Sequence, residues 1–271
     1  MKLKRSILYI ILIVFSLLML IPFAWMFSAS LKLDKDIFVF PIRWIPSNPR
    51  WTNYINIWKR IPLAKFTLNT VKITVIVTLL QLFTSSFAAY AFAKLDFKFR
   101  NSLFLCYIAT IAVPWQVYMV PQFMMMRSFG LNDTHTAIIC LQAFSAFGVF
   151  MMRQFYQGIP DELCEASRID GMNEYQIWYK IMLPLSKPSL STLTIFTFVS
   201  TWNDFLGPSI YLKTEAKKTI QIGLRMFISQ FGSEYGLIMA ASVLSLIPVF
   251  LVFISLQKYF VEGIAASGVK G

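Results

Sequence analysis

The chain has 271 residues, of which 57% are hydrophobic, 16% aromatic and only 14% charged. This composition excludes an ordinary soluble domain and predicts a polytopic membrane protein. The formal net charge is +12, but the basic residues are scattered along the sequence, which disfavours a nucleic-acid-binding protein and fits contact with anionic lipid.

Residues that hold metals or perform acid–base catalysis are scarce. His135 is the single histidine, and the three cysteines show no CxxC spacing. Cys106 and Cys140 fall in apolar segments, and Cys164 falls in a charged segment. A structural zinc site needs about four Cys or His ligands, so we expect no metal site and no catalytic residue in this chain.

Six segments qualify as transmembrane helices, because about 20 apolar residues in a helix cross a hydrocarbon core about 30 Å thick. They are Ile7–Phe27, Leu68–Phe92, Ser102–Val120, Ala137–Phe155, Leu190 to about Gly207, and Leu237–Tyr259. The first follows "MKLKR" and could be a cleaved signal sequence. Its apolar run is longer than the roughly 7 to 15 residues of such signals, which favours an uncleaved anchor.

The segment between the first two spans, residues 31–66, contains four prolines and several tryptophan and tyrosine residues. Aromatic rings favour the headgroup level, so we expect an interfacial stretch with a short amphipathic helix near Tyr54–Trp58. The chain then divides into an N-terminal helix with its external segment (1–66), a transmembrane core (67–262) and a C-terminal tail (263–271).

Basic residues near the spans indicate the orientation. The short clusters "MKLKR" (1–5) and "KLDFKFR" (94–100) flank the first two spans, and cytoplasmic flanking segments are enriched in Lys and Arg. A count over all segments is nearly a tie, because residues 31–66 also hold seven basic residues. The short clusters count most, so we expect both termini in the cytoplasm.

Small side chains recur at the end of the second span, at Ser85, Ala89 and Ala93. Such a strip permits close helix contact, either within the chain, which we favour, or with another subunit. Pro114, Pro121 and Pro248 remove backbone donors from long helices, which in a membrane indicates kinks that face protein or a water-filled path.

Polar and aromatic side chains in or beside the spans are candidates for a solute path. Asp204, preceded by Trp202 and Asn203, is a functional candidate because acidic groups are rare at membrane depth. It also fits a simpler role as a solvated or helix-capping residue. The other candidates, which could stack on a sugar or bond to it but are more often packing residues, are Trp115, Gln116, Gln142 and Phe144.

A charged segment, "PDELCEASRIDGMNEYQIWYKIMLP" (160–184), separates the fourth and fifth spans. Pro160 fits the first turn of a helix, and the acidic residues after it suit the positive end of the helix dipole. Gly171 can adopt the left-handed conformation that ends a helix. Asn173 can cap a second helix that runs to Pro184. The sequence therefore predicts two short helices bent at a glycine.

The first of these helices is amphipathic. Its apolar residues recur at helical spacing from Leu163 to Ile169, while Asp161 and Glu165 lie on another face with Arg168 as the only cation that answers them within the helix. A helix that rests on anionic lipid should be basic, so this acidic face favours a protein partner that carries Arg or Lys. An elbow lying on the membrane surface is the alternative.

The same segment resembles the cytoplasmic signature of permease subunits in binding-protein-dependent ABC importers: Glu-Ala-Ala, three residues, Gly, nine residues, Ile-x-Leu-Pro. The matching positions are Glu165, Ala166, Gly171, Ile181, Leu183 and Pro184, with Ser167 in place of the usual third alanine. "TWNDFLGP" (201–208) and "LIMAASVLSLIPVFLVFISLQKYFVEGIAASGVKG" (237–271) resemble the maltose-type second permease of the sugar-importer branch. The likeness extends from the first span to the C-terminus.

The resemblance implies an all-α polytopic fold with six transmembrane helices, the type I ABC importer permease fold, in which residues 161–184 are the coupling helix. The residues that would couple to an ATPase are Glu165, Ala166, Ser167, Asp170, Gly171, Ile181, Leu183 and Pro184. Glu165 would pair with a basic residue of that ATPase. Gly268 and Lys270 would contact it as well, unless the tail is simply frayed.

The implied function is that of a non-catalytic permease subunit of an importer for a sugar or oligosaccharide, working by alternating access in a bacterial or archaeal cell (inner) membrane. Its partners would be a second permease subunit in a heterodimer, a cytoplasmic ABC ATPase dimer, an extracytoplasmic solute-binding protein and membrane lipid. The chain has no G-x-x-x-x-G-K-[ST] loop, so ATP and Mg would be used by the partner, and this chain would bind no cofactor.

A secondary transporter driven by an ion gradient is the alternative function. It would need paired charges at mid-membrane and two related halves of the chain, and neither is clear in the sequence.

Overall fold

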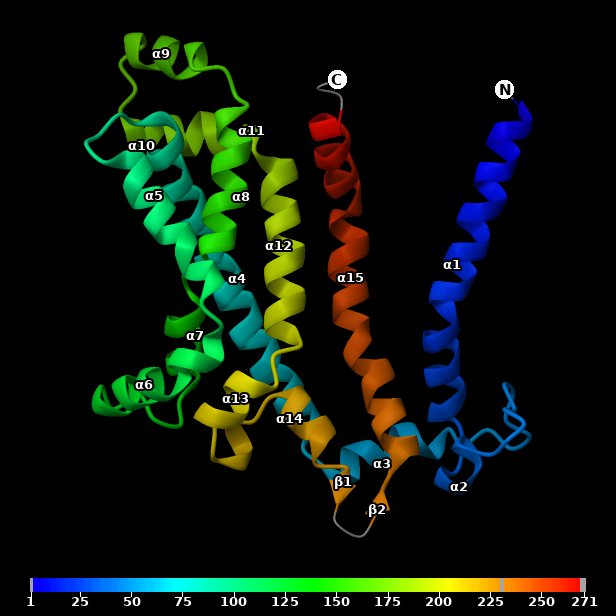
Figure 1. The fold of residues 1–271 in the computed structure, drawn as a ribbon. Helices are drawn as coiled ribbons and strands as arrows, with labels where there is room; N and C mark the ends of the chain where they lie inside the picture. Colours follow the sequence, from blue (N-terminus) through cyan, green and yellow to red (C-terminus); the bar gives the residue numbers. More distant parts are fainter. Residues whose placement is uncertain (1, 230–231, 269–271) are drawn as a thin grey trace. The chain divides into compact units, whose positions relative to one another are not determined.

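The computed structural model describes residues 2–229 and 232–268, and its regular structure is almost entirely helical (Figure 1). The described residues contain one hairpin, in which β1 (Ile228–Ser229) pairs antiparallel with β2 (Gly232–Ser233). The α-helices are α1 (Lys2–Ser30), α2 (Asp34–Ile37), α3 (Thr52–Arg60), α4 (Leu63–Lys94), α5 (Arg100–Ala109), α6 (Trp115–Ser128), α7 (His135–Gln142), α8 (Ala146–Gln157), α9 (Glu162–Ile169), α10 (Glu174–Ile177), α11 (Leu183–Leu185), α12 (Lys187–Trp202), α13 (Leu206–Tyr211), α14 (Ile220–Arg225) and α15 (Tyr235–Gly268). Three short turns of other helix types are η1 (Thr110–Ala112), η2 (Trp178–Met182) and η3 (Glu215–Lys217).

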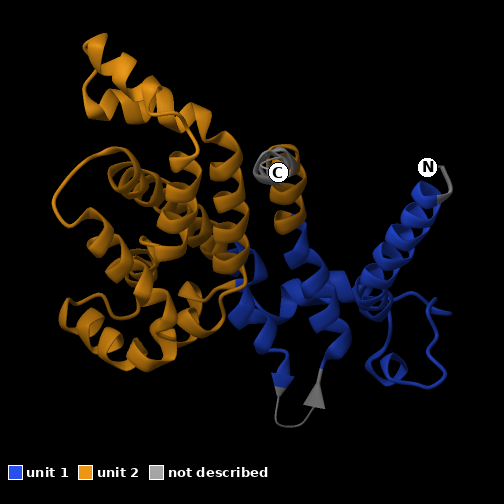
Figure 2. Ribbon diagram, turned by 45° about the horizontal axis from the view of Figure 1, so that its top comes forward, with its two compact units in different colours: residues 1–67, 220–247 blue, residues 68–219, 248–271 orange. Residues whose placement is uncertain are grey.

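The chain divides into two compact units, coloured separately in Figure 2. Unit 1 comprises residues 1–67 and 220–247, and unit 2 comprises residues 68–219 and 248–271. The three-part division expected from the sequence stays a prediction.

Unit 1 joins the end of α1 to α3 through buried polar groups. The amide of Asn53 donates to the backbone oxygens of Ser30 at 2.8 Å and Lys32 at 3.1 Å. The hydroxyl groups of Ser30 and Tyr54 lie 2.7 Å apart. These bonds satisfy carbonyl groups that the end of a helix leaves open. Helix α3 confirms the short helix expected near Tyr54–Trp58.

Four helices among the described residues are long and apolar enough to cross a membrane: Lys4–Ser30, Leu63–Lys94, His135–Gln157 and Tyr235–Tyr259. A fifth candidate is the pair Arg100–Ala112 and Trp115–Ser128, which is bent by 100°. The structure therefore supports a multi-pass chain with four or five such helices where the sequence predicts six spans.

Three of the predicted spans need correction. Ala137–Phe155 is interrupted between α7, which ends at Gln142, and α8, which begins at Ala146, although the two together still form one candidate span. Ser102–Val120 is not one helix, because Pro114 has no backbone N–H and an extended ψ of 135°, and the chain bends there before α6. Leu190–Gly207 corresponds to α12, which has 16 residues, and part of the separate helix α13. At about 1.5 Å per residue, α12 is about 24 Å long, which is shorter than a hydrocarbon core of about 30 Å.

Helices α4, α8 and α12 pack against one another in unit 2. Ser85 and Ala89 of α4 are fully buried. A Cβ added at Gly148 of α8 would clash with the Ser85 side chain and would also touch Leu193 of α12. The strip of small side chains on α4 thus serves packing within the chain, as the favoured interpretation predicts.

Polar side chains from α4 and α12 meet at the break between α7 and α8. The Gln81 amide donates to the backbone oxygen of Gln142 at 2.7 Å, and the Thr84 hydroxyl donates to that of Ala143 at 2.9 Å. Thr197 of α12 donates to the side-chain oxygen of Gln81 at 2.9 Å. Because these carbonyl groups cannot find partners within a broken helix, side chains must supply them.

We predict that Gln81→Leu loosens this break. The variant loses two hydrogen bonds, each worth about 0.6 kcal/mol between membrane helices, so the free energy of unfolding should fall by about 1 kcal/mol. Thermal unfolding in detergent measures the effect. Leu68→Ala, at a side chain of the same helix that is 68% exposed, is the control and should leave the midpoint nearly unchanged. Equal midpoints for the two variants would contradict the role given to Gln81.

Candidate functional site

The charged segment 161–184, called the elbow below, folds as two helices that meet at Gly171. At the end of α9 the backbone N–H of Met172 donates to the oxygen of Ser167, and that of Gly171 donates to the oxygen of Arg168, both at 3.0 Å. This is the Schellman arrangement, which needs a left-handed residue at the turn. Gly171 has a φ of +82°, so the glycine bend predicted from the sequence is confirmed.

The second half of the elbow starts as expected. The Asn173 side chain accepts from the backbone N–H of Gln176 at 2.9 Å, and the Gln176 side chain accepts from the backbone N–H of Asn173 at 3.0 Å. The helix then widens into the π turn η2 before Pro184, since a proline ring collides with the carbonyl four residues earlier in a regular helix. Pro160 lies just before α9, which begins at Glu162, and not in its first turn.

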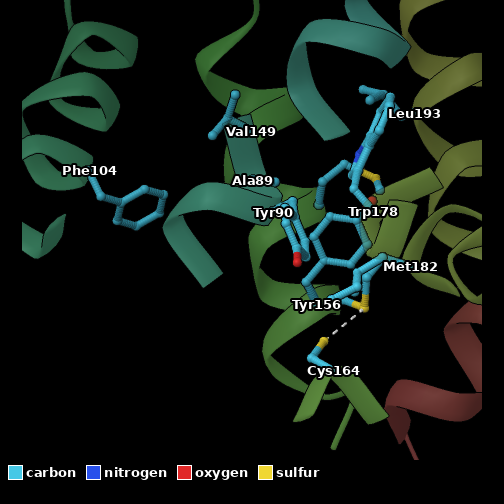
Figure 3. Close-up of a cluster of buried hydrophobic side chains, with 11 residues drawn as sticks. Ala89, Tyr90, Phe104, Val149, Tyr156, Cys164, Trp178, Met182 and Leu193 are labelled. Carbon is cyan, nitrogen blue, oxygen red and sulfur yellow. Dashed lines mark hydrogen bonds between the residues drawn. The ribbon is translucent and has the colours of Figure 1, made fainter. Parts of the chain in front are cut away.

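The inner face of the elbow is buried against other helices of unit 2 (Figure 3). Cys164 of α9 is 1% exposed, and its sulfur lies 3.9 Å from that of Met182, which is fully buried. Both residues share one apolar cluster with Tyr156 of α8 and Tyr90 of α4. The residues that carry this face include Cys164 and Ser167, which a search for large apolar side chains in α9 does not find. Burial therefore fixes the elbow on the ends of α4 and α8.

Polar bonds also hold the base of the elbow. Lys94 at the end of α4 pairs with Asp161 and donates to the backbone oxygen of Ile159 at 2.6 Å. Arg168 pairs with Glu174 at 2.8 Å, and the Tyr90 hydroxyl donates to the same carboxylate. The expectation that Arg168 answers the acidic residues of its own helix is therefore wrong. The Arg168 guanidinium instead holds the pKa of the Glu174 carboxyl below its usual range.

The outer face of α9 is acidic and apolar. Glu165, Ala166 and Asp170 are exposed, and Ile169 is 86% exposed. No residue in the described part of the chain forms an ion pair with Glu165. Because Asp161 and Glu174 are already paired, Glu165 is an acidic side chain of the elbow left available to another molecule.

The remaining signature residues lie at the elbow's second half. Ile181 and Leu183 are half-buried and pack against the apolar cluster, whereas Pro184 is exposed. Ser167 is 7% exposed, and its hydroxyl donates to the backbone oxygen of Leu163 at 2.6 Å. Ser167 can therefore be buried, because the hydrogen bond to Leu163 satisfies its hydroxyl within its own helix. The signature therefore combines buried and exposed positions.

A second site lies at the end of unit 2 opposite the elbow, where α6, α7 and α13 gather (Figure 1). It is a pocket of about 390 Å³, called the Trp115 pocket below. Its walls are Trp115, Gln116, Tyr118, Gln122, Ile138, Leu141, Gln142, Asp204, Leu206, Gly207 and Tyr211. The structure thus brings together four of the residues proposed for a solute path: Trp115, Gln116, Gln142 and Asp204.

Hydrogen bonds fix the polar groups of this pocket. The Gln142 amide donates to one oxygen of Asp204 at 2.8 Å, and the backbone N–H of Gly207 donates to the other at 3.1 Å. Asp204 therefore caps the start of α13, as the simpler interpretation anticipates, while its carboxylate also lines the pocket. The indole of Trp115 donates to Gln122 at 2.8 Å. Tyr211, another wall residue, was not selected from the sequence.

The other proposed path residues lie outside the pocket. Phe144 stands at the break between α7 and α8 and is 69% exposed, and Trp202 is fully buried. The Asn203 amide donates to the backbone oxygen of Val199 at 3.0 Å. Of the two tail residues, Gly268 is the last residue of α15, and Lys270 lies outside the described residues.

Comparison with known proteins decides the family. Residues 81–265 match the family model described as "Binding-protein-dependent transport system inner membrane component". The chain belongs to this family. It is a transmembrane permease subunit of an ATP-driven, binding-protein-dependent importer, as the signature in the elbow predicts.

Relatives match along nearly the whole chain. The arabinooligosaccharides transport system permease protein AraQ of Halalkalibacterium halodurans is 36% identical over 259 residues, which are 95% of this chain and 91% of the relative. The sn-glycerol-3-phosphate transport system permease protein UgpE of Yersinia pestis is 32% identical over 267 residues, with 96% and 95% covered.

A solved structure supports the same fold. It is described as a bacterial ABC transporter involved in the import of the acidic polysaccharide alginate, and it matches with a TM-score of 0.82 and 26% identity, covering 96% of this chain and 97% of the other. The predicted type I permease fold is confirmed, and the alternative of an ion-driven secondary transporter gains no support.

We predict that the elbow tolerates asparagine but not valine at Gly171. No atom lies within 4 Å of an added Cβ, so the difference comes from the backbone alone. A β-branched residue in the left-handed region costs about 1–2 kcal/mol or more, whereas Asn adopts it readily. Proteolysis of the elbow in the purified protein measures this. Equal cleavage rates for Gly171→Val and Gly171→Asn would contradict the account.

The ion pair between Arg168 and Glu174 predicts that the stability of the elbow depends on pH. Arg168 lowers the pKa of the Glu174 carboxyl in the folded state, so the stability that the pair adds is fully present above about pH 4.3, the ordinary pKa of glutamate. This stability is lost as the pH falls through the folded-state pKa. As the pH falls through this range, the rate at which an acid-active protease cleaves the elbow should rise. Glu174→Gln should remove this dependence, and a variant with an unchanged profile would contradict the assignment to Glu174.

Proposed function

We propose that this chain carries a carbohydrate across a bacterial or archaeal cell (inner) membrane, and that its elbow receives the motion of a separate cytoplasmic ATPase dimer. The observation that carries the proposal is the contrast between the two faces of α9. One face is buried on the ends of α4 and α8, while Glu165 and Ile169 on the other face have no partner in the described chain.

The chemistry of the outer face supports a protein partner for the elbow. An exposed isoleucine beside an unpaired carboxylate fits an apolar groove with a basic rim, where the apolar area drives association and the charge sets the register. Since the inner face of the elbow is fixed by Lys94 and Tyr90, a displacement at Glu165 would be transmitted to α4. The other coupling residues in this proposal are Ala166, Ser167, Asp170, Gly171, Ile181, Leu183 and Pro184.

The proposed assembly contains a second permease subunit in a heterodimer with this chain and an extracytoplasmic solute-binding protein. Both termini would lie in the cytoplasm on the side of the elbow, and Gly268 and Lys270 of the tail would reach the ATPase. ATP and Mg would be bound by that partner. This chain would be non-catalytic and would bind no cofactor.

The carbohydrate assignment is supported by the names of the AraQ relative and the alginate transporter. The proposed path begins at the Trp115 pocket, which supplies Trp115, Gln116, Gln142 and Asp204 at the end of unit 2 away from the elbow. It continues past residues near the break of α7 and α8 and the end of α12. These are Phe144, Trp202 and Asn203.

The proposed mechanism is alternating access. ATP binding would close the ATPase dimer and draw the docked elbows together, and the helices would turn from an inward-facing to an outward-facing arrangement that receives the solute. Hydrolysis would reset the cycle. The coupling needs only two arrangements of the helices that ATP and the loaded binding protein favour to different degrees.

The experiment compares Glu165→Lys with Glu215→Lys, an identical charge change at an exposed residue of η3 in unit 2. Glu165→Lys should reach the membrane at normal levels but lose association with the ATPase or uncouple ATP hydrolysis from uptake, because it opposes a basic partner. Co-purification with the ATPase and vesicle uptake are the readouts. Wild-type association and ATP-driven uptake for Glu165→Lys would contradict the proposed docking.

A further inference from the structure

In the part of the chain that the structure describes, the Trp115 pocket is lined by one acidic side chain and by no basic side chain. Of the described residues that line it, Asp204 is the only acidic one, and none is a lysine, arginine or histidine. The Asp204 carboxylate is held by neutral donors, the amide of Gln142 and backbone N–H groups at the start of α13. Those N–H groups, which could otherwise have held an anion, are already occupied by a carboxylate.

The rest of the wall suits an uncharged polyol. Trp115, Tyr118 and Tyr211 supply aromatic surface, and Gln116 and Gln122 supply amide groups. The Tyr211 residue is 2% exposed, and its hydroxyl has no hydrogen-bond partner in the described part of the chain. A buried hydroxyl without a partner is rare and marks a place where a bound group could complete the hydrogen bonding. The volume of about 390 Å³ lies within the range of small-molecule sites.

We infer that the Trp115 pocket receives an uncharged carbohydrate and discriminates against anionic solutes. This inference rests on the proposed function and narrows its substrate class. An uncharged sugar can donate hydroxyl groups to Asp204 and bond to Tyr211, whereas a carboxylate or phosphate would meet a like charge with no cation to offset it. The distinction between uncharged and anionic solutes matters for this family, because one relative of this chain is named for a neutral class of oligosaccharide and another for a phosphate ester.

The test uses the complete transporter in vesicles, with its binding protein and ATPase. Uptake is measured for two uncharged probes, arabinotriose and lactose, and for two anionic probes, sn-glycerol 3-phosphate and an alginate trisaccharide. We expect ATP-driven uptake of at least one uncharged probe and none of the anionic ones. Uptake of an anionic probe would overturn the inference and leave the proposed importer intact. Failure of the ATPase to associate would instead count against the proposed function.

A pair of variants tests the pocket itself, with uptake rates measured at saturating solute-loaded binding protein. Tyr211→Phe removes only the unpartnered hydroxyl, so its thermal midpoint should stay level or rise. Its uptake rate for the uncharged solute should fall by about 2- to 10-fold, because a hydrogen bond is lost. Ser209→Ala removes an exposed hydroxyl of the same helix that bonds to Leu206 within that helix and should keep the wild-type rate. A wild-type uptake rate for Tyr211→Phe would overturn the assignment of this pocket to the solute.

Discussion

Burial of one face of α9 is the constraint on which the rest of the site depends. Cys164, Met182 and Tyr156 close an apolar cluster beneath the elbow, and the Lys94 and Glu174 bonds fix its edges. A charged segment at the end of membrane helices would otherwise move independently of them. Because it is packed down, its exposed acidic face has a defined direction, and in the proposed mechanism a push on that face would reach the ends of α4 and α8.

At the opposite end of unit 2 the backbone is irregular. The helix is interrupted between α7 and α8, and the chain bends by 100° at Pro114 before α6. Irregular backbone at membrane depth survives only where protein or water satisfies its polar groups. Gln81 and Thr84 satisfy part of the break, and the space beside it is the Trp115 pocket. Elbow and pocket are thus joined by the same helix, α4, whose end lies under one and whose middle supports the break near the other.

The sequence predicts the elbow well because its signals are local. The left-handed Gly171, the Asn173 cap and the outward Glu165 follow from residues a few positions apart. The partner of Arg168 could not be predicted in the same way, since Glu174 comes within reach only after the glycine bend has formed. Nor could the burial of Cys164, which depends on Tyr156 and Met182 folding over it.

The spans are harder to predict than the elbow because apolar length does not reveal where a helix breaks. Ser102–Val120 is mostly apolar, yet Pro114 divides it, and the span expected at Leu190–Gly207 ends early at Trp202. For the pocket, the chemistry of the side chains was enough to predict Trp115, Gln142 and Asp204 as candidates. Tyr211 could not be predicted in this way, because nothing in its local sequence distinguishes a tyrosine of the site from a packing residue.

The central claim is that the ATPase covers the outer face of α9. The accessibility of Ile169 on that face, measured in the assembled transporter, tests this claim most directly. In a background with Cys106 and Cys140 replaced by serine, Ile169→Cys presents one reactive thiol at an exposed position, while Cys164 stays buried. The rate of its modification by a bulky maleimide is compared for the permease alone and for the complex with its ATPase. The account predicts strong protection in the complex. Equal rates with and without bound ATPase would contradict it.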